Sequence, residues 1–352
     1  MKINFIIPGT TKNGGIKMIF EYSNRLQARG HDILIYMPIV AYKLNNKGFI
    51  GLLKRSKTTL GILKRGYRVN WFNLKSSIKL VPKISDKYIR NADASIATAW
   101  PTAYDVYNLN NNKGLKYYFV QGYEIWCGKK ENVENTYMLN LHHIVVSKWL
   151  KDLMMYKFKS KNVDIVYNGI NFNEFFNDKK NFNNEHKVVT MVYSKLKLKG
   201  FSDGLKAFKM IREKIPDIKL ILFGMKKGTD IPDFAEFYLN PRKDELREIY
   251  CKSDVFIFPS KGEGWGLTPL EAMACKCAVV ATKDGAMNEV GVNGKNALIS
   301  ETDDIEGLAS NLYRILTNTD LLEKISINGY NTVLDFSWDK SVEKFENILK
   351  NS

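Results

Sequence analysis

Short apolar runs alternate with amphipathic stretches along nearly the whole chain. Apolar residues recur at helical spacing over 16–30, where Gly30 marks the end, and further helices are expected over 203–214 and around 243–252. Buried strands are predicted at 3–9, 31–37, 94–99, 116–121, 143–147, 188–194, 218–224, 254–260 and 278–282. Strands that alternate with helices in this way are typical of parallel sheets, so the expected fold class is α/β.

A segment without periodicity divides this pattern into two halves. Residues 165–187 are rich in asparagine and acidic residues, so we place an interdomain hinge at 168–187. The expected domains are 1–167 and 188–336, each doubly wound, with ligands at the carboxyl ends of the strands in a cleft between them. An amphipathic helix over 337–352 follows, and its simplest role is to cap the second domain.

Composition narrows the class of protein. The chain has 352 residues, of which 45% are hydrophobic and 26% charged, as in ordinary globular proteins with two cores. Its four cysteines form no spaced framework, which favours reduced thiols over disulfides or metal ligands. The first apolar run is too short for a signal peptide, and no run reaches about 18 residues, the length of a membrane span. We therefore expect a cytoplasmic protein.

The stretch 261–282, KGEGWGLTPLEAMACKCAVVAT, holds the strongest candidate chemistry. A strand ends just before it, a glycine-rich loop follows, and Thr268-Pro269 suits the first turn of a helix. Free backbone N–H groups and the positive end of a helix then form an anion site. Glu263 precedes that site and Glu271 lies about one turn inside the helix, so a carboxylate flanks each side of a bound diphosphate. A sugar nucleotide has this layout, although each glutamate alone could be a solvated loop charge or a helix-terminal acid.

With these residues the chain resembles the retaining family 4 glycosyltransferases, which have the GT-B fold and a signature of two glutamates separated by seven residues. The resemblance covers nearly the whole chain. Residues 14–36 are similar to the family's first loop, helix and strand, 165–176 to its interdomain asparagine-glycine segment, and 199–208 to its phosphate-contacting lysine-glycine. It implies two Rossmann-like domains facing across a cleft, with the terminal helix crossing back onto the first domain.

The resemblance also implies roles for individual residues. Glu263 would contact hydroxyls of the transferred sugar, Glu271 would hold the ribose, and Lys199 would pair with the diphosphate and stabilise the leaving nucleotide. Glu263 and Lys199 are thus the expected catalytic residues. The other donor-binding residues would be Gly14, Gly15, Ser194, Lys195, Gly264, Trp265, Gly266, Leu267 and Thr268.

Some positions depart from the family pattern. An arginine usually lies about five residues before the lysine, where this chain has Ser194 followed by Lys195. A histidine is common in the loop after the strand at 116–121, where this chain has Gln121 with Glu124 three residues on. Gln121 and Glu124 are the expected acceptor-side residues, and the QGYE sequence resembles a branch that includes rhamnosyl and related cell-surface transferases.

The reaction implied is transfer of a sugar from a nucleotide diphosphate-sugar to a glycan or lipid-linked acceptor in cell-surface polysaccharide or glycoconjugate biosynthesis. A front-face route is favoured, because Glu263 is assigned to hydroxyls and not to the anomeric carbon. No D-x-D motif lies near a strand end, so neither a metal nor another cofactor is expected. A sugar-nucleotide epimerase of the same fold and a non-catalytic partner subunit remain alternatives.

The net charge of +16 is concentrated in one region. Residues 43–90 hold thirteen Lys or Arg and a single acid, and within them 48–67 reads as a basic amphipathic helix. We expect this helix to lie on an anionic membrane, at the inner face of the plasma membrane, while a surface helix packed on the domain core is the alternative. No nucleic-acid-binding motif accompanies the charge, so nucleic acid is not an expected partner.

Overall fold

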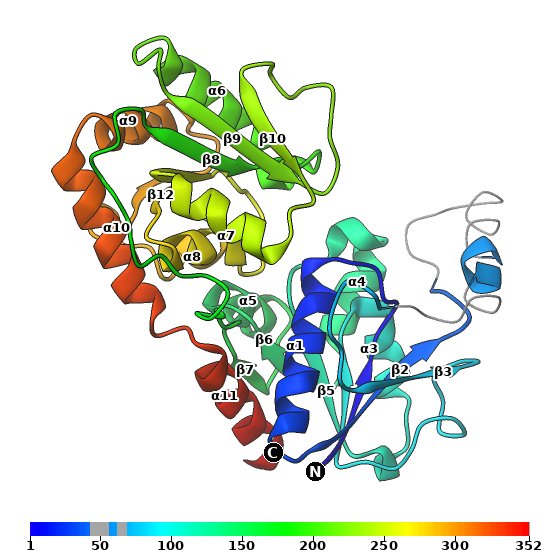
Figure 1. Ribbon diagram of the computed structural model, residues 1–352. Coiled ribbons are helices and arrows are strands. Elements are labelled where there is room, and N and C mark those ends of the chain that lie inside the picture. The colour runs from blue at the N-terminus through cyan, green and yellow to red at the C-terminus, as the bar shows by residue number, and fades with distance from the viewer. Residues whose placement is uncertain (43–55, 62–68, 352) are drawn as a thin grey trace. The chain divides into compact units, whose positions relative to one another are not determined.

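The computed structural model describes residues 1–42, 56–61 and 69–351 (Figure 1). By its contacts the chain divides into a first unit, Met1–Tyr167 with Ser341–Ser352, and a second unit, Asn168–Lys340. The segment 168–187, predicted as a hinge, belongs to the second unit. Phe182 lies in the core of that unit, and the Phe175 ring centroid is 6.1 Å from that of Tyr250, so apolar residues hold the segment there.

The first unit is built on a seven-stranded parallel sheet in the order β3-β2-β1-β4-β5-β6-β7. Its strands are β1 (Lys2–Ile6), β2 (Asp32–Pro38), β3 (Ser77–Val81), β4 (Ala94–Ala97), β5 (Leu115–Val120), β6 (His142–Val145) and β7 (Val163–Ile165). Its described helices include α1 (Gly14–Ala28), α3 (Trp100–Tyr107), α4 (Lys130–Tyr137) and α5 (Lys148–Asp152), with shorter turns at η1 (Asn111–Lys113), η2 (Ile125–Cys127) and η3 (Leu153–Lys157). The strand order reverses between β1 and β4, where doubly wound folds bind ligands.

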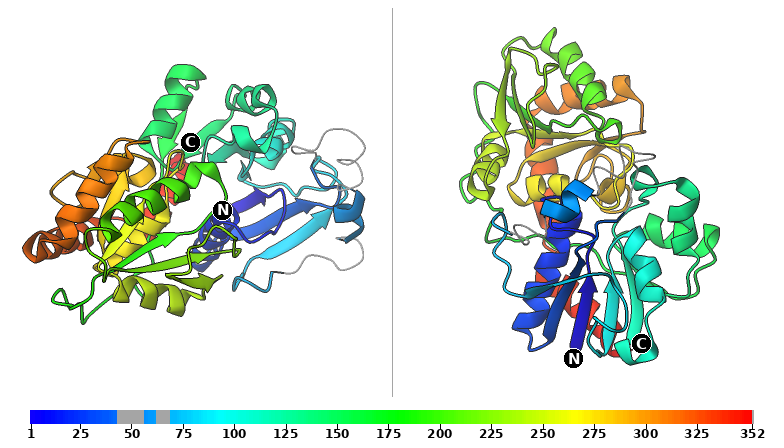
Figure 2. Two further views of the ribbon diagram at one scale, coloured as in Figure 1. Left: turned by 90° about the horizontal axis from the view of Figure 1, so that it is seen from above. Right: turned by 90° about the vertical axis from the view of Figure 1, so that its right-hand side faces the viewer.

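Helix α1 follows directly from its sequence. The Asn13 side chain caps its first turn by accepting a hydrogen bond from the Ile16 N–H, at 2.9 Å. The apolar residues at helical spacing, among them Ile19 and Phe20, are fully buried against the unit's core. Figure 2 shows α1 running alongside the strands of this sheet in a second view.

The last described helix, α11 (Trp338–Asn351), packs on the first unit beside α1 (Figure 1). Phe345 is fully buried, and its ring centroid lies 4.7 Å from that of Tyr22 and 6.4 Å from that of Phe5. Arg29 donates to Glu346 at 2.9 Å. The prediction from the residues alone, a cap on the second domain, is therefore wrong, and the crossing implied by the family resemblance is confirmed.

The second unit has a six-stranded parallel sheet in the order β10-β9-β8-β11-β12-β13. Its strands are β8 (Val188–Val192), β9 (Lys219–Gly224), β10 (Ala235–Leu239), β11 (Val255–Phe258), β12 (Ala278–Thr282) and β13 (Leu298–Ser300). Its helices are α6 (Phe201–Arg212), α7 (Lys243–Lys252), α8 (Leu267–Ala274), α9 (Ile305–Leu316) and α10 (Thr319–Val333), with turns at η4 (Lys197–Lys199) and η5 (Gly285–Asn288). Here the order reverses between β8 and β11, next to the glycine-rich stretch.

The predicted membrane-binding helix lies largely outside the described residues. Of the segment 48–67, only 56–61 is described; these residues are helical, and most are exposed. Among the described helices, none combines the length and the apolar character needed to cross a membrane.

Candidate functional site

The glycine-rich stretch forms a loop between β11 and α8, at the carboxyl edge of the second sheet. Gly266 is the N-cap of α8, so the helix begins at Leu267 and its first N–H groups lie at this edge. Gly264 and Trp265 are buried, while Leu267 and Thr268 are partly exposed. The Trp265 ring packs on Phe336, with centroids 5.7 Å apart. The local geometry is that of a helix N-terminus that favours an anion.

Lys199 and Glu263 form an ion pair at this edge. The Lys199 ammonium donates to the Glu263 carboxylate, and the Ser260 hydroxyl lies 3.5 Å from the same carboxylate oxygen. The side chain of Lys199 is 37% exposed and that of Glu263 is 16% exposed, so the lysine faces solvent more than its partner does. The structure therefore brings together the two residues that the sequence predicts as catalytic.

Gly200 makes this contact possible. It has φ +65°, and a Cβ atom there would lie 1.7 Å from the carbonyl oxygen of Pro259. The backbone after η4 thus touches the backbone at the end of β11, an approach that only glycine allows. This close packing sets Lys199 beside the loop that carries Glu263.

Asp284, which the sequence analysis did not single out, holds the same loop from the other side. Its carboxylate accepts hydrogen bonds from the N–H groups of Gly262 and Glu263, both at 2.9 Å. Burial raises the pKa of Asp284; the backbone donors oppose this shift and the nearby Glu263 carboxylate adds to it. At the next residue, Gly285 with φ +52°, a Cβ would lie 2.5 Å from the Trp265 carbonyl oxygen. The turn after β12 therefore fixes the backbone on which Glu263 sits.

Glu271 lies within α8 and is only 6% exposed. The buried Tyr250 hydroxyl is its neighbour, and the pKa of Tyr250 lies well above its ordinary value because of burial first and the Glu271 carboxylate second. The predicted ribose ligand is thus a largely buried carboxylate, supported from the side of α7.

The two remaining donor-side residues of this unit lie in the loop after β8. The Ser194 hydroxyl accepts a hydrogen bond from the Leu196 N–H at 3.2 Å, so it organises the turn that leads to η4. Lys195 is exposed. The pKa of Asp230 is lowered, mainly by the hydrogen bond from Tyr193 and to a smaller extent by the positive charge of Lys195. A second cation is therefore present near the family's arginine position, on a solvent-facing side chain.

The other predicted site residues belong to the first unit. Gly14 and Gly15 begin α1 after β1, and the Gln121 side-chain amide donates to the Gly15 carbonyl at 3.2 Å. The Glu124 carboxylate accepts from the Trp100 N–H at 2.8 Å, at the start of α3. These contacts gather the loops after β1, β4 and β5 at one edge of the sheet.

Glu124 is the titratable group of this first-unit edge. Burial raises its pKa to about 7, although the Trp100 N–H and the Tyr118 hydroxyl both stabilise its charged form. The Tyr137 hydroxyl accepts a hydrogen bond from the Glu124 backbone N–H, at 3.1 Å. A carboxyl that titrates near neutrality is able to exchange a proton with a bound hydroxyl.

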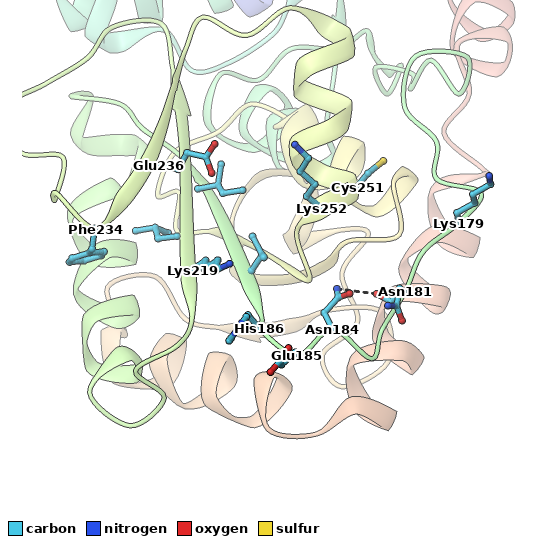
Figure 3. Close-up of a pocket in the computed structure, with 13 residues that line it drawn as sticks. Lys179, Asn181, Asn184, Glu185, His186, Lys219, Phe234, Glu236, Cys251 and Lys252 are labelled. Atoms are coloured by element: carbon cyan, nitrogen blue, oxygen red, sulfur yellow. Dashed lines mark hydrogen bonds between the residues drawn. The ribbon is translucent and has the colours of Figure 1, made fainter.

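A pocket of about 650 Å³ opens at the opposite edge of the second sheet (Figure 3). Its lining includes Val188 and Lys219, at the amino ends of β8 and β9, and Cys251 near the end of α7. None of the predicted donor-binding residues lines it. Separately, no cluster of His, Cys, Asp and Glu suited to a metal ion occurs in the described part of the chain.

Comparison with protein families adds to this geometry. Residues 172–332 match the family described as glycosyl transferases group 1. The capsular polysaccharide biosynthesis glycosyltransferase CapM of Staphylococcus aureus is 28% identical over 207 residues, which are 53% of this chain and 54% of that protein. The N-acetyl-alpha-D-glucosaminyl L-malate synthase of Bacillus anthracis is 27% identical over 207 residues, or 54% of each. The chain spans about half the length of the curated relatives that it matches.

Solved structures agree on the fold. Anabaena Alr3699/HepE in complex with UDP-glucose superposes with a TM-score of 0.75 at 14% identity, over 100% of both chains. A point mutant of S. aureus TarM, in complex with Fondaparinux, alpha-GlcNAc-glycerol and UDP, gives a TM-score of 0.71 at 12% identity, again over 100% of both chains. At this identity the likeness shows the fold alone: two Rossmann-like units of the GT-B type. The fold is thus of the GT-B type, and residues 172–332 match the glycosyl transferases group 1.

Proposed function

We propose that this chain, a GT-B fold whose residues 172–332 match the glycosyl transferases group 1, moves a sugar from a nucleotide diphosphate-sugar to a glycan or lipid-linked acceptor. The observation that carries the proposal is the Lys199–Glu263 pair, held at the N-terminal end of α8. A cation, a carboxylate and the N-terminal end of a helix at one sheet edge suit a ligand that carries both phosphates and sugar hydroxyls.

Donor binding then exchanges partners within this pair. The diphosphate takes the Lys199 ammonium, which frees the Glu263 carboxylate to accept hydrogen bonds from the sugar hydroxyls. Backbone N–H groups between Gly264 and Leu267 share the phosphate charge, and Glu271 accepts from the ribose. Because the ion pair exists before the donor arrives, both groups are already positioned, which lowers the entropic cost of ordering them.

The chemical step proceeds with retention at the anomeric carbon. The bond to the phosphate breaks on the same face that the acceptor hydroxyl approaches, and the leaving phosphate oxygen accepts the acceptor's proton. Lys199 and the helix N–H groups stabilise the negative charge that develops on the diphosphate. No residue in this route requires a metal or another cofactor.

The acceptor is assigned to the first unit, with Gln121 and Glu124 as its hydroxyl partners. Both side chains already use one polar atom to order the loops, and each retains further hydrogen-bonding capacity for a sugar. The name of the relative CapM refers to capsular polysaccharide biosynthesis, which supports a surface glycan as the product. Cytoplasmic location and peripheral contact with the inner membrane face, through 48–67, form part of the same proposal.

The first test is thermal unfolding of the purified chain against UDP-, GDP-, dTDP- and ADP-sugars, without metal and then with magnesium. A donor at one hundred times its dissociation constant adds about 2.7 kcal/mol to the free energy of unfolding. The shift should occur with one nucleotide class, without metal, and should disappear in Glu271→Ala. Incubation with donor and acceptor, followed by NMR of the product, should then give the donor's own anomer. An inverted product refutes the mechanism, and stabilisation by nucleic acid in place of every donor refutes the function.

A further inference from the structure

The pocket at the amino edge of the second sheet is built from separate parts of one unit (Figure 3). The segment 179–186, which the sequence analysis placed in a hinge, contributes one side. The amino ends of β8 and β9, the start of β10 and the end of α7 contribute the rest. Its volume of about 650 Å³ lies within the range of protein pockets that hold small molecules, about 300–1,000 Å³.

Hydrogen bonds fix the segment side of the pocket to the sheet. The Asn184 side-chain amide donates to the Asp254 carboxylate at 3.2 Å, and the other oxygen of that carboxylate accepts from the Val188 N–H at 2.8 Å. Asp254 is fully buried, so water does not compete for this link. Asn184 also donates to the Asn181 carbonyl at 3.3 Å, the dashed line in Figure 3. The pocket is therefore preformed, and a ligand does not have to order it.

Cationic side chains outnumber carboxylates around the pocket. Its lining includes three lysines, two glutamates and one histidine: Lys179, Lys219, Lys252, Glu185, Glu236 and His186. Figure 3 shows Lys179 at the margin, apart from Lys219 and Lys252. Within the described residues, no carboxylate forms an ion pair with any of these lysines, while Glu236 accepts a hydrogen bond from the Tyr238 hydroxyl. The Lys219 and Lys252 ammonium groups thus favour an anionic ligand.

A lysine outside the lining offsets an unfavourable charge beside it. Helix α7 ends at Lys252, and the carbonyl groups at the C-terminus of a helix carry partial negative charge, which disfavours an anion. The Lys180 ammonium donates to two carbonyls at this end, those of Cys251 at 3.5 Å and Ser253 at 2.5 Å. Because these carbonyls already have a cationic partner, the end of α7 repels an anion less.

The sheet supplies the apolar part of the pocket. Val188, Leu220 and Ile221 line it from β8 and β9, and the last two are buried. Phe234 adds an aromatic ring just before β10, and the Arg212 guanidinium, 4.0 Å from the centroid of that ring, brings a further positive charge to this side. A ligand that matches both parts of the lining joins an apolar ring to an anionic group.

We propose that this pocket binds small organic anions that carry an apolar ring, such as aromatic sulfonates, carboxylates or phosphates. The ring packs on the apolar residues of β8 and β9, and the ammonium groups of Lys219 and Lys252 supply the charge for the anionic group. The site is separate from the candidate donor site, because none of the predicted donor-binding residues lines it. The proposal therefore does not depend on glycosyl transfer.

Calorimetric titration of the full-length chain with 2-naphthalenesulfonate tests the ligand class. We expect one site per chain, and about tenfold weaker binding of 2-naphthalenemethanol, which has the same ring without the charge. Lys219→Gln and Lys252→Gln should each weaken binding of the sulfonate by about three- to tenfold, while Lys219→Arg, which keeps the charge, should not. Lys209→Gln, at an exposed lysine of α6, is the matched control and should bind normally.

Alkylation of cysteines by iodoacetamide locates the bound probe. Cys251 lines the pocket and Cys127 belongs to the first unit, and both are partly exposed. At ten times its dissociation constant, 2-naphthalenesulfonate should slow alkylation of Cys251 about tenfold and leave that of Cys127 unchanged, as measured by peptide mass spectrometry. Absence of binding, equal affinity for the sulfonate and the alcohol, or equal protection of both thiols would overturn the proposal. Displacement of the probe by a nucleotide-sugar would place it in the candidate donor site and would also overturn it.

Discussion

The carboxyl edges of the two sheets differ in how they hold their polar groups. In the second unit, Lys199 and Glu263 neutralise one another, and Asp284 accepts two backbone hydrogen bonds within the same loop. In the first unit, Glu124 receives its hydrogen bond from the start of α3, and burial raises its pKa to about 7. The second unit thus has an ion pair and a loop-holding carboxylate at this edge, and the first has a carboxyl that changes charge near neutrality. This difference fits a charged diphosphate ligand on one unit and a neutral hydroxyl ligand on the other.

The largest effect is expected from loss of the cation in the ion pair of the second unit. Lys199→Ala removes the cation assigned to the leaving diphosphate, so kcat should fall by about 10²- to 10³-fold while the fold persists. Lys209→Ala, which removes an exposed lysine from α6, is the matched control and should leave kcat unchanged. Steady-state kinetics with the donor found by thermal unfolding measures both. If kcat fell equally in both variants, the effect would come from net charge and not from the position of Lys199, and the comparison between the two sheet edges would lose its support.

A smaller effect is expected from the carboxylate that holds the loop. Asp284→Ala leaves two backbone N–H groups without their acceptor. A hydrogen bond to a charged acceptor contributes about 1.5–3 kcal/mol to stability. We expect kcat to fall by about 10- to 100-fold, with Asp284→Asn intermediate because it keeps one acceptor oxygen. Asp303→Ala, which removes an exposed ion pair with Lys261, provides the baseline. Wild-type kinetics in Asp284→Ala would show that Glu263 needs no support from β12.

The titrating carboxyl makes stability depend on pH in a defined direction. Glu124 holds its proton up to about pH 7 in the folded chain, against an ordinary value of 4.5. Between these two values the folded state binds more protons than the unfolded state, so the free energy of unfolding falls as pH rises through this window. Glu124→Gln should lessen that fall, as measured by denaturant unfolding at several pH values. A steeper fall in the variant would contradict the raised pKa.

The smallest effect concerns the far end of α8. Lys276 adopts φ +54°, a left-handed conformation in which glycine is favoured by about 1 kcal/mol. Lys276→Gly should therefore stabilise the chain slightly. The gain is reduced by loss of the contact between the Lys276 ammonium and the Tyr330 ring, whose centroid lies 5.1 Å away. Thermal unfolding measures the gain, and kcat should not change. A loss of activity in Lys276→Gly would mean that the glycine-rich loop is sensitive to changes at the far end of α8.

Much of this arrangement was predictable, because buried parallel strands are continuous apolar runs. The runs at 188–194, 254–260 and 278–282 became β8, β11 and β12 with small shifts at their ends. Strand β10 was missed because it lies at the sheet edge with no fully buried residue, and β13 because it has three residues. Exposed edges and very short strands carry too little apolar periodicity to be recognised.

In the candidate site, too, some features were predictable from the sequence and others were not. Glu263, Glu271 and Lys199 stand in sequence patterns that suggest chemistry, and the structure brings Lys199 to Glu263. That these two pair with one another was not predicted, because the pairing depends on the backbone contact between Gly200 and Pro259, residues far apart in the chain. Asp284 was missed because an Asp-Gly pair after a strand is a common turn signal, and its role lies in backbone contacts that no motif records.

The return of α11 to the first unit has a consequence for how the chain folds during synthesis. Phe345 completes the aromatic cluster of Phe5, Tyr22 and Phe119, yet the whole second unit is translated before it. Until α11 leaves the ribosome, these three rings lack their last neighbour and expose an apolar surface. The amino-terminal unit therefore cannot finish folding first, as amino-terminal domains generally do. Its completion waits until the second unit and α11 have been translated.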